Sequence, residues 1–141
     1  MLKGIPSLLS PELLKVLCEM GHGDEIVIGD GNFPAASMAN HLVRCDGHGV
    51  PELLDAILQY FPLDTFSQFP VTLMAAPPED AKPVIWNKYE GIISKYDSRG
   101  DKAIQYLSRF DFYENAKKSY AIIATGESAL YACLILKKGI C

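Results

Sequence analysis

Residues 10–30 read SPELLKVLCEMGHGDEIVIGD, and this stretch decides the fold. Its first half is typical of an amphipathic helix, with Ser10 as the N-cap, Pro11 in the first turn and apolar residues at helical spacing. Its second half, Glu25–Gly29, is short, β-branched and mostly apolar, which is typical of a buried strand. A glycine-rich turn joins the two and Asp30 follows the strand, so the stretch predicts one unit of an α/β fold.

The same alternation of helix and strand patterns continues along the chain. Further helices are predicted over 51–61, 85–96 and 111–118, and further strands over Leu42–Cys45, Val71–Met74, Tyr120–Thr125 and Leu130–Leu136. Asp111 and Glu114 have the spacing of a capping box, so the last helix is expected to begin there.

The last two predicted strands are too close in sequence for a crossover helix between them, which predicts that they pair as an antiparallel hairpin. A hairpin among otherwise helix-connected strands makes the sheet mixed. We therefore expect an α/β three-layer sandwich, with a central mixed sheet flanked by helices, in a single domain that spans residues 1–141.

Composition excludes several classes of protein. The net charge of −4, with scattered lysines and arginines, argues against a nucleic-acid partner. No apolar stretch approaches the ~20 residues that cross a bilayer, so no membrane partner is expected. Gly4, Pro6 and Pro11 interrupt any apolar run near the N-terminus, so no signal peptide is expected.

The four cysteines are widely spaced, and no Cys-x-x-Cys pair occurs. Neither a zinc site nor a disulfide framework is therefore indicated. Reduced thiols in a cytoplasmic protein fit this pattern better. The three histidines include no helical i, i+4 pair, so no metal is expected. A phosphate loop and a dinucleotide fingerprint are also missing.

His22 lies between two glycines, directly after the first helix and before the first strand. Without bulky neighbours in sequence its imidazole is expected to be open to a ligand. A histidine has an ordinary pKa of about 6.5, so His22 is a candidate general acid or base. The alternative is a helix-terminal histidine that complements the helix dipole. Asp24 either orients the ring or is a solvated loop carboxylate.

Two more charged residues are candidates for ligand binding: Asp30 for hydroxyl groups, and Arg109 for a sugar or a carboxylate. Asp30 follows a strand, where its carboxylate can accept hydrogen bonds from ligand hydroxyls, or else it caps its own turn. Arg109 precedes the last helix and can donate a planar fork of N–H groups, or else it is a surface arginine.

Tyr131 and Cys133 lie two residues apart, on the same face of the last predicted strand. The Tyr131 hydroxyl is a candidate proton relay or ligand contact. The alternative is a half-buried aromatic side chain that only packs against the sheet.

Several of these segments together resemble the L-fucose mutarotase and D-ribose pyranase family. The resemblance rests on Leu8–Leu14, Met20–Ile26, Asp30 with Asn32–Ala35, Arg44–Gly47, Arg109–Glu114, Ala124–Glu127, Leu130–Tyr131 and Leu136–Gly139. It covers both ends and most of the chain, and is weakest over residues 66–103. The Arg-Phe-x-Phe-Tyr-Glu segment at 109–114 is similar to the fucose branch rather than the ribose branch.

The resemblance implies an isomerase that interconverts the anomers of a free monosaccharide, with L-fucose as the expected sugar and no cofactor. His22 matches the family's proton donor, and Asp30, Arg109 and Tyr131 match its sugar-binding positions. The tripeptide Tyr131-Ala132-Cys133 occupies a further sugar-binding place. The family usually has asparagine where Cys133 stands, and a thiol is a weaker hydrogen-bond partner than an amide.

Three further expectations follow from the resemblance. His22 and Asp30 are expected to flank one pyranose. A homo-oligomeric ring, often a decamer, is expected, with sites near the subunit contacts. Pyranase activity, from pyranose to furanose, uses the same ring-opened intermediate and is compatible with the same site.

Two other classes of function remain open from the sequence. A sugar-binding or regulatory module without turnover would keep Asp30 and Arg109 and tolerate the loss of His22. A purely structural ring-forming subunit would show no sugar-dependent change in melting temperature.

Overall fold

Six strands form one mixed sheet in the computed structural model, which describes the whole chain, residues 1–141. The strands are β1 (Glu25–Gly29), β2 (Leu42–Cys45), β3 (Val71–Met74), β4 (Ile104–Leu107), β5 (Ala121–Thr125) and β6 (Leu134–Lys137). Their spatial order is β2-β5-β1-β6-β3-β4. The predicted mixed sheet is confirmed.

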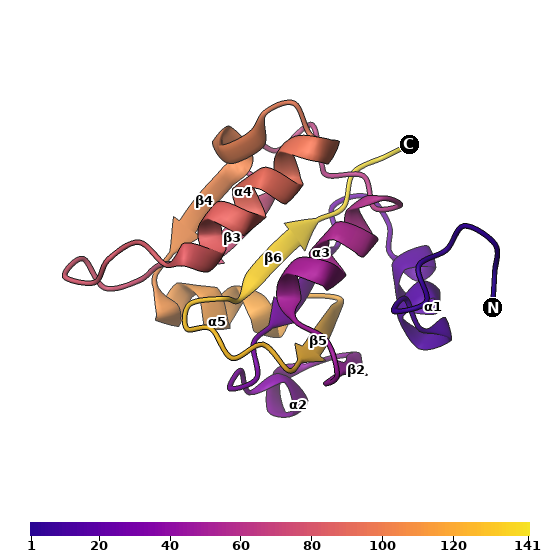
Figure 1. Cartoon of the computed structure of the whole chain (residues 1–141), viewed down its shortest axis with the longest axis horizontal. Coiled ribbons are helices and arrows are strands. Elements are labelled where there is room, and N and C mark those ends of the chain that lie inside the picture. Colours follow the sequence, from indigo (N-terminus) through magenta and orange to yellow (C-terminus); the bar gives the residue numbers. More distant parts are fainter.

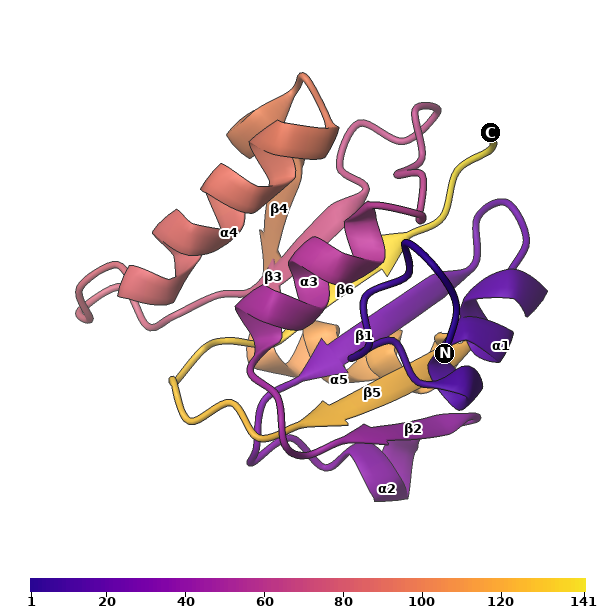
Figure 2. The same ribbon diagram turned by 45° about the vertical axis from the view of Figure 1, so that its right-hand side comes forward.

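Helices cover both faces of this sheet, as Figures 1 and 2 show. They are α1 (Pro11–Glu19), α2 (Ala35–Met38), α3 (Val50–Leu58), α4 (Val84–Tyr96) and α5 (Arg109–Lys118), with a short 3₁₀ helix, η1 (Gly100–Ala103). Side chains of α1, α3 and α4 share the larger core cluster, and those of α2 and α5 share the smaller one. The predicted three-layer arrangement is therefore confirmed.

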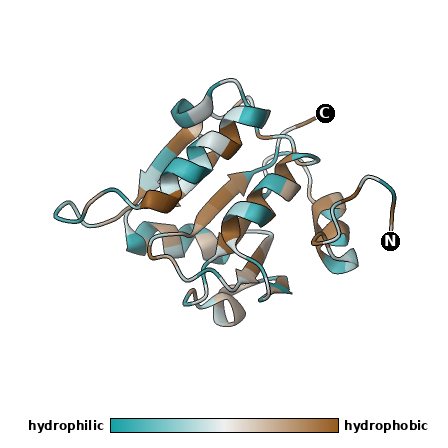
Figure 3. Cartoon of the chain, in the orientation of Figure 1, coloured by the Kyte–Doolittle hydropathy of each residue, from teal (hydrophilic) through white to brown (hydrophobic).

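Because helices cover both faces of the sheet, its central strands are buried. All residues of β3 and β5 are buried, and β1 is buried from Ile26 to Gly29, so these strands read as continuous apolar runs. Figure 3 shows the hydrophobic colour concentrated on the strands and on the helix faces turned toward them. No helix is long and apolar enough to span a membrane.

Strand direction decides where functional residues meet. β1 is parallel to β5, β5 to β2 and β3 to β4, whereas β6 is antiparallel to both of its neighbours, β1 and β3. Strands β1 to β5 therefore all end at one edge of the sheet, where β6 begins. We call this the carboxyl edge, and the opposite one the amino edge.

The predicted hairpin of the last two strands is wrong. β1 lies between β5 and β6, and β6 pairs with β1 and β3 instead. The connection over residues 126–133 crosses the end of β1 at the carboxyl edge. Neighbouring strands are only about 5 Å apart, so a connection of this length easily passes over one strand.

The last strand also begins later than predicted, at Leu134 rather than Leu130. Tyr131 has a φ of 56°, the only positive φ in the chain outside glycine. A left-handed residue interrupts an extended strand, so regular pairing starts only after it.

Helix α5 begins at Arg109 instead of Asp111. Its N-cap is Ser108, whose hydroxyl accepts a hydrogen bond from the backbone N–H of Asp111 at 3.2 Å. Asp111 thus lies in the first turn, where its charge favours the positive end of the helix dipole. This shift makes Arg109 the first helical residue. Helix α2 and strand β4 were not predicted.

Candidate functional site

Five of the predicted site residues meet at the carboxyl edge of the sheet. Asp30 directly follows β1, and Arg109 follows β4 after one intervening residue. The segment Tyr131–Cys133 directly precedes β6, which pairs with β1. Asp30 and Cys133 lie 103 positions apart in the sequence. The antiparallel direction of β6 relative to β1 brings them to one edge of the sheet.

Asp30 has two separate roles for its polar groups. Its Oδ1 accepts a hydrogen bond from the backbone N–H of Asn32 at 3.0 Å, which is the turn-capping role. Its Oδ2 has no hydrogen-bond partner in the chain, so this oxygen is available to a ligand hydroxyl. The two alternatives drawn from the sequence therefore apply to different oxygens of one carboxylate.

Cys133 lies behind Asp30 rather than beside a ligand. Only 2% of this residue is exposed, and its Sγ accepts the backbone N–H of Asp30 at 3.3 Å. Burial and the nearby Asp30 charge raise the pKa of the thiol, so it stays protonated. The side chain thus supports the Asp30 backbone, and any ligand contact of this residue has to come from its main chain.

The backbone of Tyr131–Cys133 offers a row of donors. None of the three N–H groups has an acceptor in the chain. Ala132 and Cys133 are nevertheless buried, and buried N–H groups are nearly always paired. A ligand oxygen is the kind of acceptor that satisfies such a row.

Arg109 and the Tyr131 side chain provide the exposed part of the carboxyl edge. The Arg109 guanidinium lies over the Tyr113 ring, 5.3 Å from its centroid, and is otherwise open to solvent. The Tyr131 hydroxyl donates to Asp80 Oδ2 at 3.4 Å. Burial and the Asp80 charge raise the pKa of Tyr131, and the Arg109 charge opposes this, so the phenol is a donor near neutral pH.

Two shallow hollows lie at this edge. Asp30 lines one of about 270 Å³, together with Phe33, Arg44 and Asp46. Tyr131 lines another of about 300 Å³, together with residues that include Leu130. Asp30 and Tyr131 share neither hollow, and His22 lines neither of them.

The expected contact of His22 and Asp30 around one sugar is not formed within a chain. His22 lies at the amino edge and Asp30 at the carboxyl edge, with the five residues of β1 between them. At about 3.3 Å per residue this strand spans roughly 17 Å, more than one pyranose ring. The reason is simple: the two residues flank the same strand at opposite ends.

His22 is nevertheless accessible and oriented. Its side chain is 45% exposed, and its Nε2 lies 3.0 Å from Oδ1 of Asp64, whose side chain is 7% exposed. Its ring also lies 5.4 Å from the Phe66 ring, centroid to centroid. An imidazole held at one nitrogen by a carboxylate presents its other nitrogen in a fixed direction.

Asp24 does not orient the ring. Its Oδ2 accepts the backbone N–H of Gly21 at 2.7 Å, so it is a loop-capping carboxylate. Asp64 takes the orienting role instead. Burial alone raises the pKa of Asp64, but hydrogen bonds from the Phe66 N–H and His22 outweigh burial and leave this pKa below its ordinary value.

Asp64 was missed by sequence reasoning because it lies 42 residues from His22, in a stretch without a motif. Its backbone N–H bonds to the Lys137 carbonyl at 3.1 Å, beside the end of β6. Long-range contacts of this kind bring it to His22.

Glu127 is a second missed residue. Its Oε2 accepts the N–H of Val50 at 3.2 Å and its Oε1 accepts the N–H of Ala129 at 3.0 Å. It therefore ties the segment leading to Tyr131 to the start of α3. Gly126 precedes it, and a Cβ there would lie 2.2 Å from the Asp46 carbonyl oxygen.

The other two histidines have structural partners. His41 Nδ1 lies 2.8 Å from the Tyr120 carbonyl oxygen, and its ring stacks on Tyr120. His48 Nδ1 lies 3.2 Å from Glu52 Oε1.

Fucose mutarotases are among the known proteins that are similar to this chain. The chain is 49% identical to the fucose mutarotase of Bos taurus over 146 residues, covering 99% of this chain and 94% of the relative. The fucose mutarotase of Streptococcus pneumoniae, solved in complex with L-fucose, superposes with a TM-score of 0.94 at 53% identity, with 99% of each chain covered. FucU from Bifidobacterium longum superposes with a TM-score of 0.95 at 57% sequence identity, again with 99% of each chain covered.

The ribose branch is more distant. RbsD of Bacillus subtilis, solved with D-ribose, gives a TM-score of 0.74 at 25% identity, covering 100% of this chain and 99% of the other. The predicted similarity to the fucose branch is thereby confirmed. Residues 3–141 match the profile described as the RbsD / FucU transport protein family, and the chain belongs to this family.

Proposed function

We propose that this protein interconverts the anomers of L-fucose by acid–base ring opening and closure, without a cofactor. The observation that carries the proposal is the carboxyl-edge group: a free Asp30 oxygen, the exposed Arg109 guanidinium and three unpaired backbone N–H groups lie at the same edge of the sheet. Carboxylate, guanidinium and amide groups together match the donors and acceptors of sugar hydroxyls. The fucose mutarotases similar to this chain support L-fucose as the sugar.

Mutarotation needs a proton at the ring oxygen and the loss of one from the anomeric hydroxyl. The C1–O5 bond then breaks, the aldehyde rotates about C1–C2, and the ring closes on the other face. His22 donates a proton to the ring oxygen while a solvent water accepts the proton of the anomeric hydroxyl, and both transfers reverse when the ring closes. Asp30 accepts a hydrogen bond from a sugar hydroxyl. Arg109, Tyr131 and the N–H groups of Tyr131–Cys133 hold the remaining oxygens. Pyranase activity proceeds through the same open form.

The two halves of this machinery lie at opposite edges of the sheet, so the site requires two copies of the chain. His22 of one subunit faces the Asp30 and Arg109 of a neighbour. Exposed apolar side chains at both edges support such contacts: Phe66 beside His22 is 76% exposed, and Leu130 beside Tyr131 is 68% exposed. Burial of these side chains against a neighbouring subunit would remove apolar surface from water.

A head-to-tail contact of this type repeats from copy to copy, and it closes into a ring where the rotation between copies divides a full turn. We propose a homo-oligomeric ring, with a decamer as the family resemblance implies. Each subunit is one sugar-mutarotase-like domain, residues 1–141, because every strand belongs to the same sheet.

A cytoplasmic location is proposed from the cysteines. All four are free thiols, and Cys45 and Cys133 are buried among apolar side chains. Free thiols persist in a reducing compartment.

The second candidate is a sugar-binding or regulatory module without turnover. The observation that favours it is the absence of a complete His22–Asp30 arrangement within one chain. A structural ring subunit without sugar affinity is the third candidate.

Exchange NMR on L-fucose separates these functions. Wild-type protein is expected to speed α/β exchange, and His22→Ala to lose roughly 10²–10⁴-fold of that acceleration while still binding the sugar. Equal acceleration by both proteins rules out His22 as the acid. If wild type binds L-fucose without speeding exchange, the protein is the non-catalytic module. If L-fucose does not change the melting temperature in a thermal-shift assay, the protein is the structural subunit.

A further inference from the structure

The left-handed backbone at Tyr131 is held by its surroundings. Its φ of 56° is unique among the non-glycine residues of the chain. A bulky residue adopts this conformation only where neighbouring contacts fix it, and such residues gather at ligand sites. Two of the contacts that hold the segment come from helix α4.

Three successive carbonyls of the Tyr131–Cys133 segment are all occupied. The Tyr131 carbonyl accepts the indole N–H of Trp86 at 2.8 Å, and the Ala132 carbonyl accepts the hydroxyl of Tyr89 at 2.7 Å. The Cys133 carbonyl accepts the N–H of Met74 at 3.4 Å. The three carbonyls are thus bound to the protein, and the three N–H groups are free.

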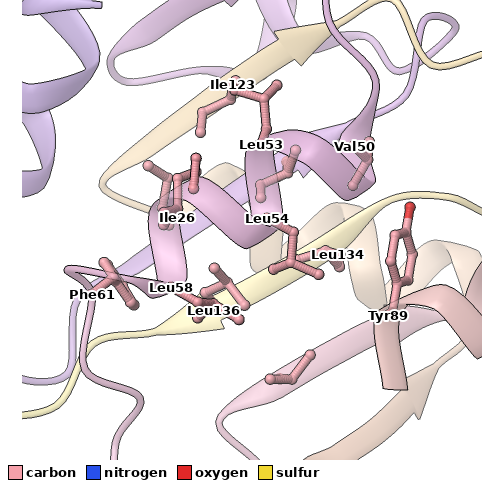
Figure 4. Packing of buried hydrophobic residues seen from close by; sticks show 14 of the residues in the cluster. Ile26, Val50, Leu53, Leu54, Leu58, Phe61, Tyr89, Ile123, Leu134 and Leu136 are labelled. Atoms are coloured by element: carbon pink, nitrogen blue, oxygen red, sulfur yellow. The ribbon is translucent and has the colours of Figure 1, made fainter. Parts of the chain in front are cut away.

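Trp86 and Tyr89 are well suited to this task. They lie three residues apart on α4 and therefore project from the same face of that helix. Trp86 is 8% exposed and Tyr89 is fully buried. Figure 4 shows Tyr89 among buried side chains of α3 and β6, including Leu54 and Leu134. Such packing leaves the two rings little freedom to turn away.

The Tyr89 hydroxyl keeps its proton and donates a hydrogen bond to the Ala132 carbonyl. Burial, with the charges of Glu127 and Asp30, raises the pKa of Tyr89 far above neutrality. The indole N–H of Trp86 has no acceptor capacity at all. Two donors on α4 therefore hold the Tyr131 and Ala132 carbonyls toward that helix.

We propose that Trp86 and Tyr89 are positioning residues that hold the strained Tyr131–Cys133 segment, so that its free N–H groups stay directed at a sugar oxygen. The sugar part of this inference rests on the proposed function. Neither residue touches the sugar. Both act through the carbonyls of the segment, and Cys133 continues the chain of support to the Asp30 N–H.

The test uses Tyr89→Phe and Trp86→Phe in the assembled protein, each of which removes one donor and keeps an aromatic ring. Tyr96→Phe is the matched control, because Tyr96 lies at the far end of the same helix and its hydroxyl donates to Asp55 at 2.8 Å. Two readouts are taken: the ¹⁵N order parameters of the Ala132 and Cys133 amides without sugar, and KM and kcat for L-fucose by exchange NMR.

Both variants are expected to lower the order parameters at Ala132 and Cys133. They are expected to raise KM about tenfold, the effect of one neutral hydrogen bond, and to change kcat less than about threefold. Tyr96→Phe is expected to change none of these. A merely structural role would lower the melting temperature and leave KM untouched.

Unchanged amides and unchanged KM in both variants overturn the proposal. If wild type shows no turnover of L-fucose, the proposed function fails separately. The order parameters then still decide whether the two aromatic side chains hold the segment.

Discussion

Asp64 is the residue that makes His22 more than an exposed loop histidine. Its buried carboxylate lies 3.0 Å from one ring nitrogen and leaves the other free. The glycine context of His22 predicted an accessible imidazole, and 45% exposure of the side chain agrees with it. The partner was not predictable, because nothing local in the sequence relates Asp64 to residue 22.

The contribution of Asp64 to the stability of the fold depends on pH in the acid range. Hydrogen bonds keep the pKa of Asp64 below its ordinary value of about 3.9. A carboxyl whose pKa is lower in the folded state stabilises the fold above about pH 3.9 and loses that contribution as pH falls through the folded value. The amide in Asp64→Asn does not titrate, so this variant lacks the pH-dependent stabilisation.

We therefore expect the melting temperature of Asp64→Asn to lie below that of wild type at about pH 6, and the gap to narrow below about pH 3.9. Activity on L-fucose is expected to fall about tenfold or more, because an amide orients the ring less strongly than a carboxylate. Thermal melts over pH and exchange NMR measure both. Asp24→Asn is the control, and a gap independent of pH would contradict the account.

At the scale of elements, the connection from β5 to β6 is the feature that builds the carboxyl edge. Residues 126–133 leave β5, cross the end of β1 and enter β6 on its other side. Proximity in sequence suggested a hairpin here, but strand order is decided by long-range packing. The strand pattern from Leu130 onward was equally ambiguous, because the apolar residues 132–133 are buried without being paired as a strand.

Gly126 tests the path of this connection. Gly126→Ala would place Cβ 2.2 Å from the Asp46 carbonyl oxygen, so the backbone must shift. A shift of this kind costs about 1–3 kcal/mol of unfolding free energy, and we expect a lower melting temperature together with a raised KM for L-fucose. Gly47→Ala is the matched control, since no atom lies within 4 Å of its added Cβ. Equal melting temperatures and KM values for the two variants would show that the close approach at Gly126 is unimportant.

At the scale of the whole molecule, the sheet places the acid and the sugar-binding group at opposite edges. Hydrophobic patterning predicted the layers, because burial on both faces of the sheet leaves apolar runs such as 25–29 and 121–125. Motifs and the family resemblance predicted the site residues one by one. The sequence did not predict that one chain separates His22 from Asp30, because the expected contact assumed that residues at the two ends of one strand lie close together in space.

Subunit complementation tests the two-copy site most directly. His22→Ala and Arg109→Ala are each expected to be inactive on L-fucose, because every site in the homogeneous ring lacks one component. When equal amounts are unfolded and refolded together, half of the subunits keep His22 and half keep Arg109. If partners combine at random, about one quarter of the sites are intact. The account predicts recovery of roughly a quarter of wild-type anomer exchange in the mixture, and no recovery above the separate variants would contradict it.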